Sequence, residues 1–312
     1  MLKFYLAFVV LIQAAYGING RCRALVLGGG SDRGAFQAGA ISGLATYLPP
    51  GEATWDLVLG NGVGAFNAFF VAQTSINQES TLNYTLSNFW LNFKRSQFYH
   101  PWFGGRLVGY FLKTGLYNDA PLKATIKSKF TGAFNRFLLV GVTDLHESKY
   151  YMLNSSQPTE NLLLSIQASL NTHGNFPIIN FGKYQFASGE IIFGVDLASA
   201  VYYCQGLGYR NSHITVDIAM VTNAKLKPFD PTGKNVLEMT QRYTEIVNYH
   251  NVFERIINAK GNFPGVLFRT QITMNDNILM KSTYPFSYES PKHLKTEFNE
   301  GILAAKSALG VK

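Results

Sequence analysis

Two glycine-rich turns lie near the start of the chain, and the second has the spacing of a catalytic turn. Residues 57–60 predict a short strand, and the residues from Val63 onward predict a helix. Gly60 and Gly64 lie two positions on either side of Gly62, as the sharp strand-to-helix turn of a G-x-S-x-G motif requires. A serine at the centre of such a turn is a nucleophile for acyl transfer. This chain has glycine there, so the motif is present without its reacting atom.

The first turn can supply the complementary half of that chemistry. It joins a short strand to a helix and contains four glycines and an arginine: Gly28, Gly29, Gly30, Arg33 and Gly34. The backbone N–H groups of such a turn can hold a phosphate or the oxyanion of an acyl-transfer intermediate. A dinucleotide site is not indicated, because three residues rather than two separate Gly30 from Gly34 and the acidic Glu52 falls in a turn.

Strands and helices alternate through most of the chain, which predicts an α/β sandwich with a mainly parallel central sheet. Strands are expected at 24–27, 53–60, 136–145, 149–154, 213–221 and 265–273. Helices are expected at 36–48, 63–73, 80–95, 120–130, 159–170, 199–208, 238–259 and 295–309. No linker, internal repeat or low-complexity segment divides the chain.

Taken together, these motifs resemble those of the patatin-like phospholipases. The family has the same order of strand-GGGxxRG-helix followed by strand-GxxxG-helix. Its later segments are resembled, in the same order, by three stretches of this chain: RFLLVGVTDLHESKYYMLN, LLSIQASLNTHGNFPII and YQFASGEIIFGVDLASAVYYCQGLG. The resemblance covers residues 22–222, and residues 223–312 form a C-terminal extension of the same patatin-like domain. It implies a patatin-like three-layer α/β/α sandwich with an oxyanion loop at the first turn and a nucleophile elbow at the second. It also implies a catalytic serine in the elbow and a catalytic aspartate in a later D-G-G or D-G-A sequence.

Both members of that catalytic pair are missing. The family's serine falls on Gly62, and its aspartate falls on Ser188, whose hydroxyl is a very poor base near neutral pH. Glu190 is the nearest substitute for the aspartate, but in extended chain it lies about 6.6 Å beyond the base position. A base has to come within about 2.6–3.2 Å of the group that it deprotonates. Neither Ser42 nor Cys204 is expected to reach the elbow as a substitute nucleophile.

The leading hypothesis is therefore a catalytically inactive protein that keeps a cleft for lipid, fatty acid or a membrane surface. The aromatic segment 98–103 either forms the lip of that cleft or dips into a headgroup layer, or it covers a core edge instead. Arg33 either meets an anionic headgroup or braces its loop. Two alternatives remain: an active lipid acyl hydrolase with a displaced pair, and a structural scaffold for an unknown protein partner.

Composition narrows the other possibilities. The chain has 312 residues, 47% of them hydrophobic and 15% charged, which indicates a folded core rather than disorder. The net charge of +8 is spread along the chain without a basic stripe, so nucleic-acid binding is not indicated. The six histidines are scattered, and neither a metal site nor a cofactor is expected.

The first twenty residues have the layout of a secretory signal peptide. Lys3 precedes an apolar run from Phe4 to Ile12, and small residues follow, so that cleavage is expected near residue 17 or 20. The run is too short for a comfortable transmembrane helix. A mature protein of residues 21–312, secreted or lumenal in the secretory pathway, is expected.

Two further features of the sequence are consistent with passage through the secretory pathway. Asn83 and Asn154 begin N-x-S/T triplets that are acceptors for glycosylation. Cys22 and Cys204 could form a disulfide in an oxidising compartment, or remain two separate thiols.

Overall fold

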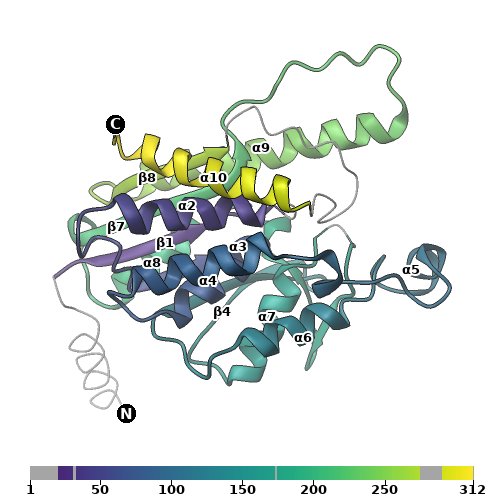
Figure 1. Ribbon diagram of the computed structural model, residues 1–312, viewed down its shortest axis with the longest axis horizontal. Coiled ribbons are helices and arrows are strands. Elements are labelled where there is room, and N and C mark those ends of the chain that lie inside the picture. Colours follow the sequence, from purple (N-terminus) through teal and green to yellow (C-terminus); the bar gives the residue numbers. More distant parts are fainter. Residues whose placement is uncertain (1–19, 31–32, 173, 275–289, 312) are drawn as a thin grey trace.

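In the part of the chain that the structure describes, eight strands form one mixed sheet at the centre of the molecule (Figure 1). The computed structural model describes residues 20–30, 33–172, 174–274 and 290–311. The predicted signal peptide, apart from Gly20, lies outside the described residues. The strands are β1 Cys22–Leu27, β2 Leu57–Gly60, β3 Phe137–Asp144, β4 Lys149–Asn154, β5 Ile179–Phe181, β6 Tyr184–Ser188, β7 Ile214–Asn223 and β8 Leu267–Met274.

The sheet is mostly parallel, as expected. Neighbouring strands in the run β3-β2-β1-β7-β8 are parallel, whereas β4 and β6 pair with β3 in the antiparallel sense and β5 pairs with β6. Strand β2 pairs with the first half of β3, and β6 pairs with residues 142–144 beyond it. Strand β4 pairs with residues 139–144 along one edge of β3. Strands β2 and β6 therefore share the other edge of β3. The end of β6 at Ser188 is thereby brought close to the end of β2 at Gly60.

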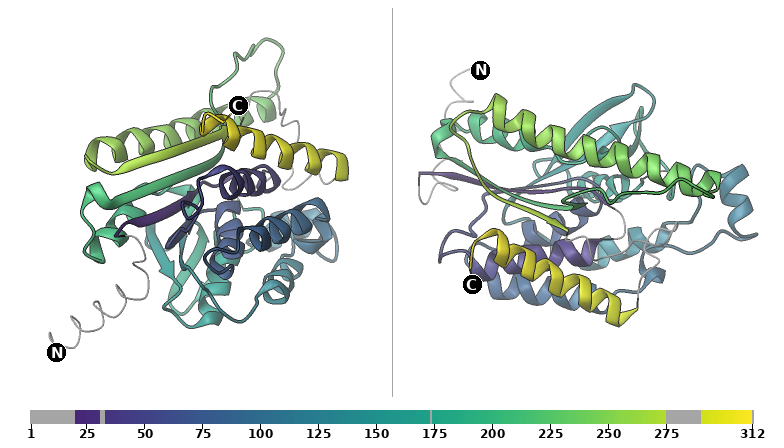
Figure 2. Two further views of the ribbon diagram at one scale, coloured as in Figure 1. Left: turned by 60° about the vertical axis from the view of Figure 1, so that its left-hand side comes forward. Right: turned by 90° about the horizontal axis from the view of Figure 1, so that it is seen from above.

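The helices cover both faces of the sheet and make a three-layer α/β/α sandwich (Figure 2). One face is covered by α2 Gly34–Tyr47, α3 Val63–Gln73, α4 Glu79–Leu91, α6 Ala120–Lys129, α7 Thr159–Ser169 and α10 Pro291–Ala308. The other is covered by α8 Leu197–Gly206 and α9 Val236–Asn262. Strand β1 shows why both faces are needed. Leu25 and Leu27 enter one core and Ala24 and Val26 enter the other, as expected for an apolar strand in the middle of a parallel sheet.

The C-terminal helix α10 packs directly on α2, backbone against backbone. A Cβ atom on Gly39 would collide with the carbonyl group of Phe298, and one on Gly301 would collide with the carbonyl of Phe36. The C-terminal extension predicted from the sequence therefore contributes to the core formed around the first turn. No helix among the described residues is both long enough and apolar enough to cross a bilayer.

A disulfide joins the start of β1 to α8 on the second face of the sheet. Cys22 and Cys204 are bonded, with their Cα atoms 5.9 Å apart and a sequence separation of 182. Both side chains are buried in the core between β1 and α8.

We expect loss of this disulfide to lower thermal stability. Closing a loop of this length restricts the unfolded chain, so Cys22→Ser with Cys204→Ser should lower the free energy of unfolding by about 3–5 kcal/mol. Calorimetry of the parent with and without reductant, beside the double variant, measures this. A parent whose melting temperature is unchanged by complete reduction, shown by thiol titration, would contradict the expectation.

Candidate functional site

The two glycine turns meet backbone to backbone at the carboxyl ends of β1 and β2. The Asn61 amide donates to the Leu27 carbonyl over 3.2 Å, which joins the elbow to the end of β1. A Cβ atom on Gly64 would collide with that same carbonyl, and one on Gly60 would collide with Gly64. The glycines at both flanks of the elbow are therefore required by close approach, as the motif predicts.

The centre of the elbow keeps a backbone conformation that glycine adopts readily. Gly62 lies at the N-cap of α3 with φ of +58° and ψ of −133°. A residue with a Cβ atom held in such a conformation costs of order 1–3 kcal/mol, so glycine relieves strain that a nucleophilic serine would impose. Its N–H donates to the Ser169 hydroxyl over 3.0 Å.

The space beside Gly62 is filled by the carboxyl group of Glu190. A Cβ atom built on Gly62 would collide with Glu190 Oε2 and would lie 3.1 Å from the Cα atom of Gly29. On the other side, a Cβ atom on Gly29 would lie 2.6 Å from the Glu190 carboxyl carbon. The carboxyl group thus lies between the oxyanion loop and the elbow, where a serine side chain would stand.

A tight turn, rather than an extended strand, brings Glu190 to this place. Strand β6 ends at Ser188, and residues Gly189–Ile191 form a single 3₁₀ turn, η2. The Ser188 hydroxyl accepts from the Glu190 amide over 3.2 Å and so caps the turn. The expected separation of about 6.6 Å assumed extended chain, and that assumption does not hold, because the strand ends at Ser188 and a 3₁₀ turn follows.

The Glu190 carboxyl is held in its protonated form more strongly than an ordinary glutamate. Burial raises its pKa to about 7, and a hydrogen bond from the Gly30 backbone N–H opposes that rise. The Oε2 atom is buried and has no hydrogen-bond partner among the described residues. A buried carboxyl without a cationic partner favours the neutral form.

Other hydroxyl groups near the elbow are engaged in structural hydrogen bonds. The Ser169 hydroxyl donates to the Gly141 carbonyl over 2.8 Å while it accepts from Gly62. Ser188 is fully buried, and its hydroxyl caps η2. Ser42 is different: it is buried in α2, and its hydroxyl has no hydrogen-bond partner among the described residues. Cys204 is bonded to Cys22.

Asn61 and Tyr150 brace the elbow from the side of β4. The Tyr150 hydroxyl donates to Asn61 Oδ1 over 3.1 Å, and Asn61 Nδ2 donates to the Phe193 carbonyl over 2.6 Å. Burial raises the pKa of Tyr150 well above its ordinary value, and the nearby Asp196 carboxylate raises it further. Tyr150 therefore remains a protonated hydrogen-bond donor and supports the elbow rather than acting as a base.

Arg33 braces the oxyanion loop. Its guanidinium donates to the Val221 carbonyl over 2.5 Å and lies 3.5 Å from Asn223 Oδ1, both on β7. Of the two roles open from the sequence, these contacts favour bracing over headgroup binding. Among the described residues, no group of three or more His, Cys, Asp or Glu side chains could hold a metal ion.

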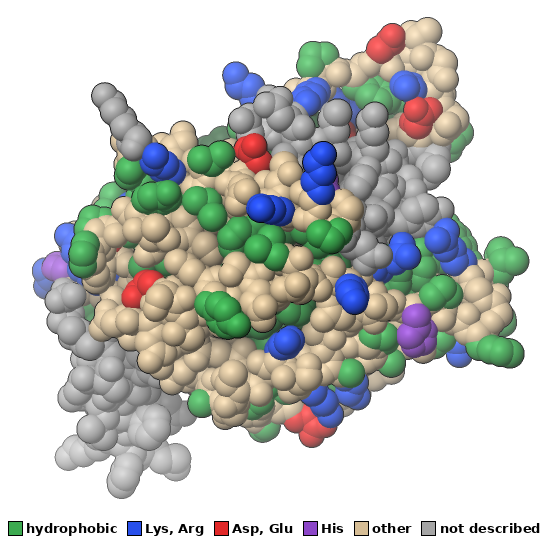
Figure 3. Space-filling model, viewed as in Figure 1, with side chains coloured by type: hydrophobic (Ala, Val, Ile, Leu, Met, Phe, Trp, Pro, Cys, Tyr) green, Lys and Arg blue, Asp and Glu red, His purple; other side chains and the backbone are tan. Residues whose placement is uncertain are grey.

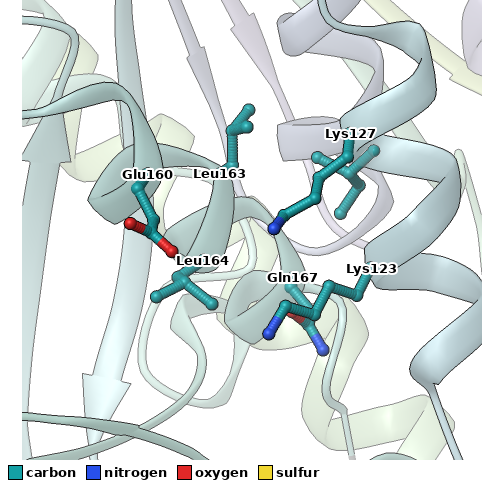
Figure 4. Close-up of a pocket in the computed structure, with 7 residues that line it drawn as sticks. Lys123, Lys127, Glu160, Leu163, Leu164 and Gln167 are labelled. Carbon is teal, nitrogen blue, oxygen red and sulfur yellow. The ribbon is translucent and has the colours of Figure 1, made fainter.

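A cavity of about 510 Å³ adjoins the Glu190 turn. It is lined mainly by apolar and uncharged polar residues: Thr114, Leu145, Asn171, Thr172, Gly174, Ile178, Ala187, Glu190, Ile191, Tyr243, Thr244, Val247, Asn248 and Asn251. Its volume lies within the range of about 300–1,000 Å³ that is usual for small-molecule sites. A second cavity, between α6 and α7, has a volume of about 10 Å³ (Figure 4). That volume corresponds to about one water molecule, and none of its lining residues belongs to the glycine turns.

The aromatic segment divides between the two roles open to it from the sequence. Phe98 and Tyr99 are buried in the core, whereas Phe103 is fully exposed.

Of the predicted glycosylation sites, Asn83 is half-buried in α4 and its amide donates to Thr46, and Asn154 is half-buried at the end of β4. Their glycosylation stays a prediction.

The class of protein follows from the sheet, the two glycine turns and a family comparison. A family model described as Patatin-like phospholipase matches residues 25–201, which is more than half of the chain. The chain belongs to the patatin-like phospholipase family, as its motifs indicated. A search of curated proteins finds no match. Among solved structures the chain is similar to the crystal structure of VipD from Legionella pneumophila, with 11% sequence identity and a TM-score of 0.46 over 93% of this chain and 67% of that one.

The position of Glu190 could have been suspected from the family motif. The D-G-G or D-G-A sequence ends in a small residue, and the corresponding sequence here, residues 188–190, ends in glutamate. A large side chain at that place has to displace something, and the missing serine side chain supplies the room. The bracing roles of Asn61, Tyr150 and Ser169 carried no comparable signal in the sequence.

We expect Glu190 to make stability depend on pH. The unfolded chain loses this proton near pH 4.5 and the folded chain near pH 7, so the folded state binds more protons between these values. The free energy of unfolding should therefore fall as pH rises from 5 to 8, by up to about 3 kcal/mol from this group.

Denaturant unfolding of parent and Glu190→Gln across that pH range measures the effect. Glu190→Gln should lose this part of the pH dependence, while Glu254→Gln, a change at a side chain that is 69% exposed, should retain it. Parallel curves for the parent and Glu190→Gln would rule out a raised pKa at this site.

Proposed function

We propose that this patatin-like protein is a pseudoenzyme that binds an apolar ligand in the cavity beside its vacated catalytic site. One observation carries the proposal: the Glu190 carboxyl lies where the serine side chain would stand. The absence of a nucleophile at Gly62 and of a carboxylate base at Ser188 agrees with it. Removing a nucleophile and base that act as a unit typically lowers the rate by several orders of magnitude.

The Glu190 carboxyl also lies against the oxyanion loop. The Gly30 N–H, which would help to hold the negative oxygen of an acyl-transfer intermediate, lies close enough to the Glu190 carboxyl to lower the pKa of that carboxyl. An ester carbonyl could reach this donor only if Glu190 moved. The glutamate therefore opposes catalysis in two ways, because its carboxyl fills the space of the nucleophile and lies against a donor of the oxyanion loop.

The lining of the cavity favours a neutral ligand over a fatty-acid anion. Among the described residues that line it, none is Lys, Arg or His, and the one acidic residue is Glu190. A carboxylate ligand would approach a carboxyl group with no cation among these residues to stabilise it. Asparagine and threonine side chains provide hydrogen-bond partners, and Ile178, Ile191 and Val247 provide apolar surface. A long-chain alcohol, an acylglycerol or another neutral lipid matches this chemistry.

Restoring catalysis should require three substitutions. Gly62→Ser alone places a side chain against Glu190, and adding Ser188→Asp leaves Glu190 in place. The triple variant with Glu190→Gly restores the family's D-G-G sequence at residues 188–190 and vacates the site. We expect the triple variant to hydrolyse p-nitrophenyl esters at least about 10³-fold faster than the parent and the double variant.

The matched control carries Gly62→Ala, Ser188→Asp and Glu190→Gly, which gives similar packing without a nucleophile. It should be as inactive as the parent. A parent that hydrolyses esters or phospholipids at the rate of the triple variant, and loses that activity in Glu190→Gln, would overturn the proposal in favour of an active hydrolase that uses Glu190.

Ligand binding is tested separately at α9. Val247→Trp should narrow the cavity and weaken binding of a fluorescent long-chain alcohol, whereas Val236→Trp lies on the same helix, is exposed and does not line the cavity. Fluorescence titration should show a loss of at least about tenfold for Val247→Trp and none for Val236→Trp. Competition at pH 8 should favour unlabelled alcohol over the fatty acid of equal length.

Equal binding by the two tryptophan variants would exclude the cavity as the binding site. Absence of any binding, together with a stable stoichiometric protein complex from the native source, would favour the scaffold alternative.

A further inference from the structure

One segment of the molecule projects from the sandwich and exposes apolar side chains. Residues 101–117, called the finger below, leave the core after Tyr99 and include the short helix α5 Arg106–Leu112 (Figure 1). Its tip holds the densest group of exposed large apolar side chains among the described residues: Phe103, Leu107, Tyr110, Phe111 and Leu112. Phe103 is fully exposed, and the other four are between 71% and 77% exposed. Figure 3 shows hydrophobic side chains gathered at the end of the molecule where α5 lies in Figure 1.

The base of the finger is firmly attached, so the exposure of its tip does not result from a frayed segment. His100 and Asn118 form a β-bridge that closes it, with hydrogen bonds of 3.2 and 3.0 Å. Trp102 Nε1 donates to the Gly115 carbonyl over 3.0 Å across the finger. Tyr117 is buried and its amide donates to the Asn175 carbonyl over 3.0 Å. A rigid base with an apolar tip is suited to inserting into another medium.

The charges around the tip favour an anionic lipid surface as that medium. Between Glu79 and Asp119 the sequence contains four basic residues, Lys94, Arg95, Arg106 and Lys113, and no acidic residue. Arg106 and Lys113 lie at the two ends of α5, close to the apolar tip. The Lys113 ammonium lies over the Trp102 ring at 5.1 Å from its centroid, and the Arg106 guanidinium lies over the Tyr117 ring at 5.8 Å. Apolar and aromatic side chains bordered by such cations are typical of segments that lie at the interface of an anionic membrane.

The finger also adjoins the cavity. Thr114, two residues beyond α5, lines the 510 Å³ cavity together with Tyr243 and Val247 of α9. The finger and the first part of α9 project from the same end of the molecule in both Figure 1 and Figure 2. A bilayer that accepted the tip would therefore lie beside the cavity.

We infer that the finger is a membrane-docking element, which inserts Phe103 and the exposed face of α5 into the interface of an anionic lipid bilayer. The inference rests on the proposed function only in naming the bilayer as the source of the cavity's ligand. Docking itself requires neither the cavity nor catalysis.

Vesicle co-sedimentation of the mature chain tests the inference. We expect the parent to bind vesicles of phosphatidylcholine with phosphatidylserine, to bind pure phosphatidylcholine more weakly, and to be released in part by high salt. Phe103→Ser with Phe111→Ser should weaken binding at least about tenfold. Tyr84→Ser with Leu303→Ser, at side chains that are 69% and 56% exposed elsewhere on the surface, should bind like the parent.

Insertion has a direct spectroscopic signature. In Phe103→Trp the added indole should show a blue-shifted emission on addition of the anionic vesicles and quenching by brominated acyl chains, relative to the parent. Equal vesicle binding by the finger variant and its control would overturn the inference. A parent that does not bind these vesicles would also overturn it. So would finger substitutions that abolish self-association in light scattering, because that result would mean that the tip contacts a second copy of the chain.

The two proposals fail separately. Val247→Trp should lose the alcohol probe and keep vesicle binding, whereas Phe103→Ser with Phe111→Ser should keep the probe and lose the vesicles. Loss of both in either variant, with circular dichroism unchanged, would mean that cavity and finger form one site and would overturn the independence of docking.

Discussion

The close approach of two strand-to-helix turns is the constraint on which the rest of the site depends. Leu27 and Gly64 touch through backbone atoms, so β1, β2 and the helices that follow them have fixed relative positions. That contact leaves a narrow gap between Gly29 and Gly62, and a single group can occupy it. In this protein the group is a carboxyl from the third position of residues 188–190. The fold thus preserves the architecture of an acyl-transfer site while its own side chain occupies the reaction space.

The chemical nature of that occupant is informative. Hydrolysis of an ester releases a carboxylic acid, and Glu190 presents the same group to the same loop N–H. The side chain therefore resembles a product retained in the site. Because burial raises its pKa to about 7, it can stay there as a neutral acid, without the cost of an unpaired buried charge. Gly62 suits this arrangement, since a Cβ atom at that position would collide with the carboxyl, which would have to shift.

The fold and the two turns could be predicted from the sequence because they depend on local patterns. Apolar runs define β1 and β7, and the spacing of Gly60 and Gly64 defines the elbow, because only glycine tolerates the contacts that they make. The conformation after Ser188 could not be predicted in this way. Whether that segment continues as a strand or turns depends on a hydroxyl that caps the turn and on space left by a residue more than a hundred positions earlier. The bracing by Asn61 and Tyr150 is likewise a property of the tertiary arrangement.

The disulfide between Cys22 and Cys204 also determines how the protein responds to cutting. The covalent loop that it closes includes the oxyanion loop, the elbow, the finger and the Glu190 turn. A protease that cleaved the exposed finger would leave two fragments that are still joined at the first strand of the sheet. Each fragment would remain at a high local concentration relative to the other, so a nicked molecule could keep its core and lose only its projecting tip. In a compartment rich in proteases, damage to the most exposed part of the chain need not become loss of the whole protein.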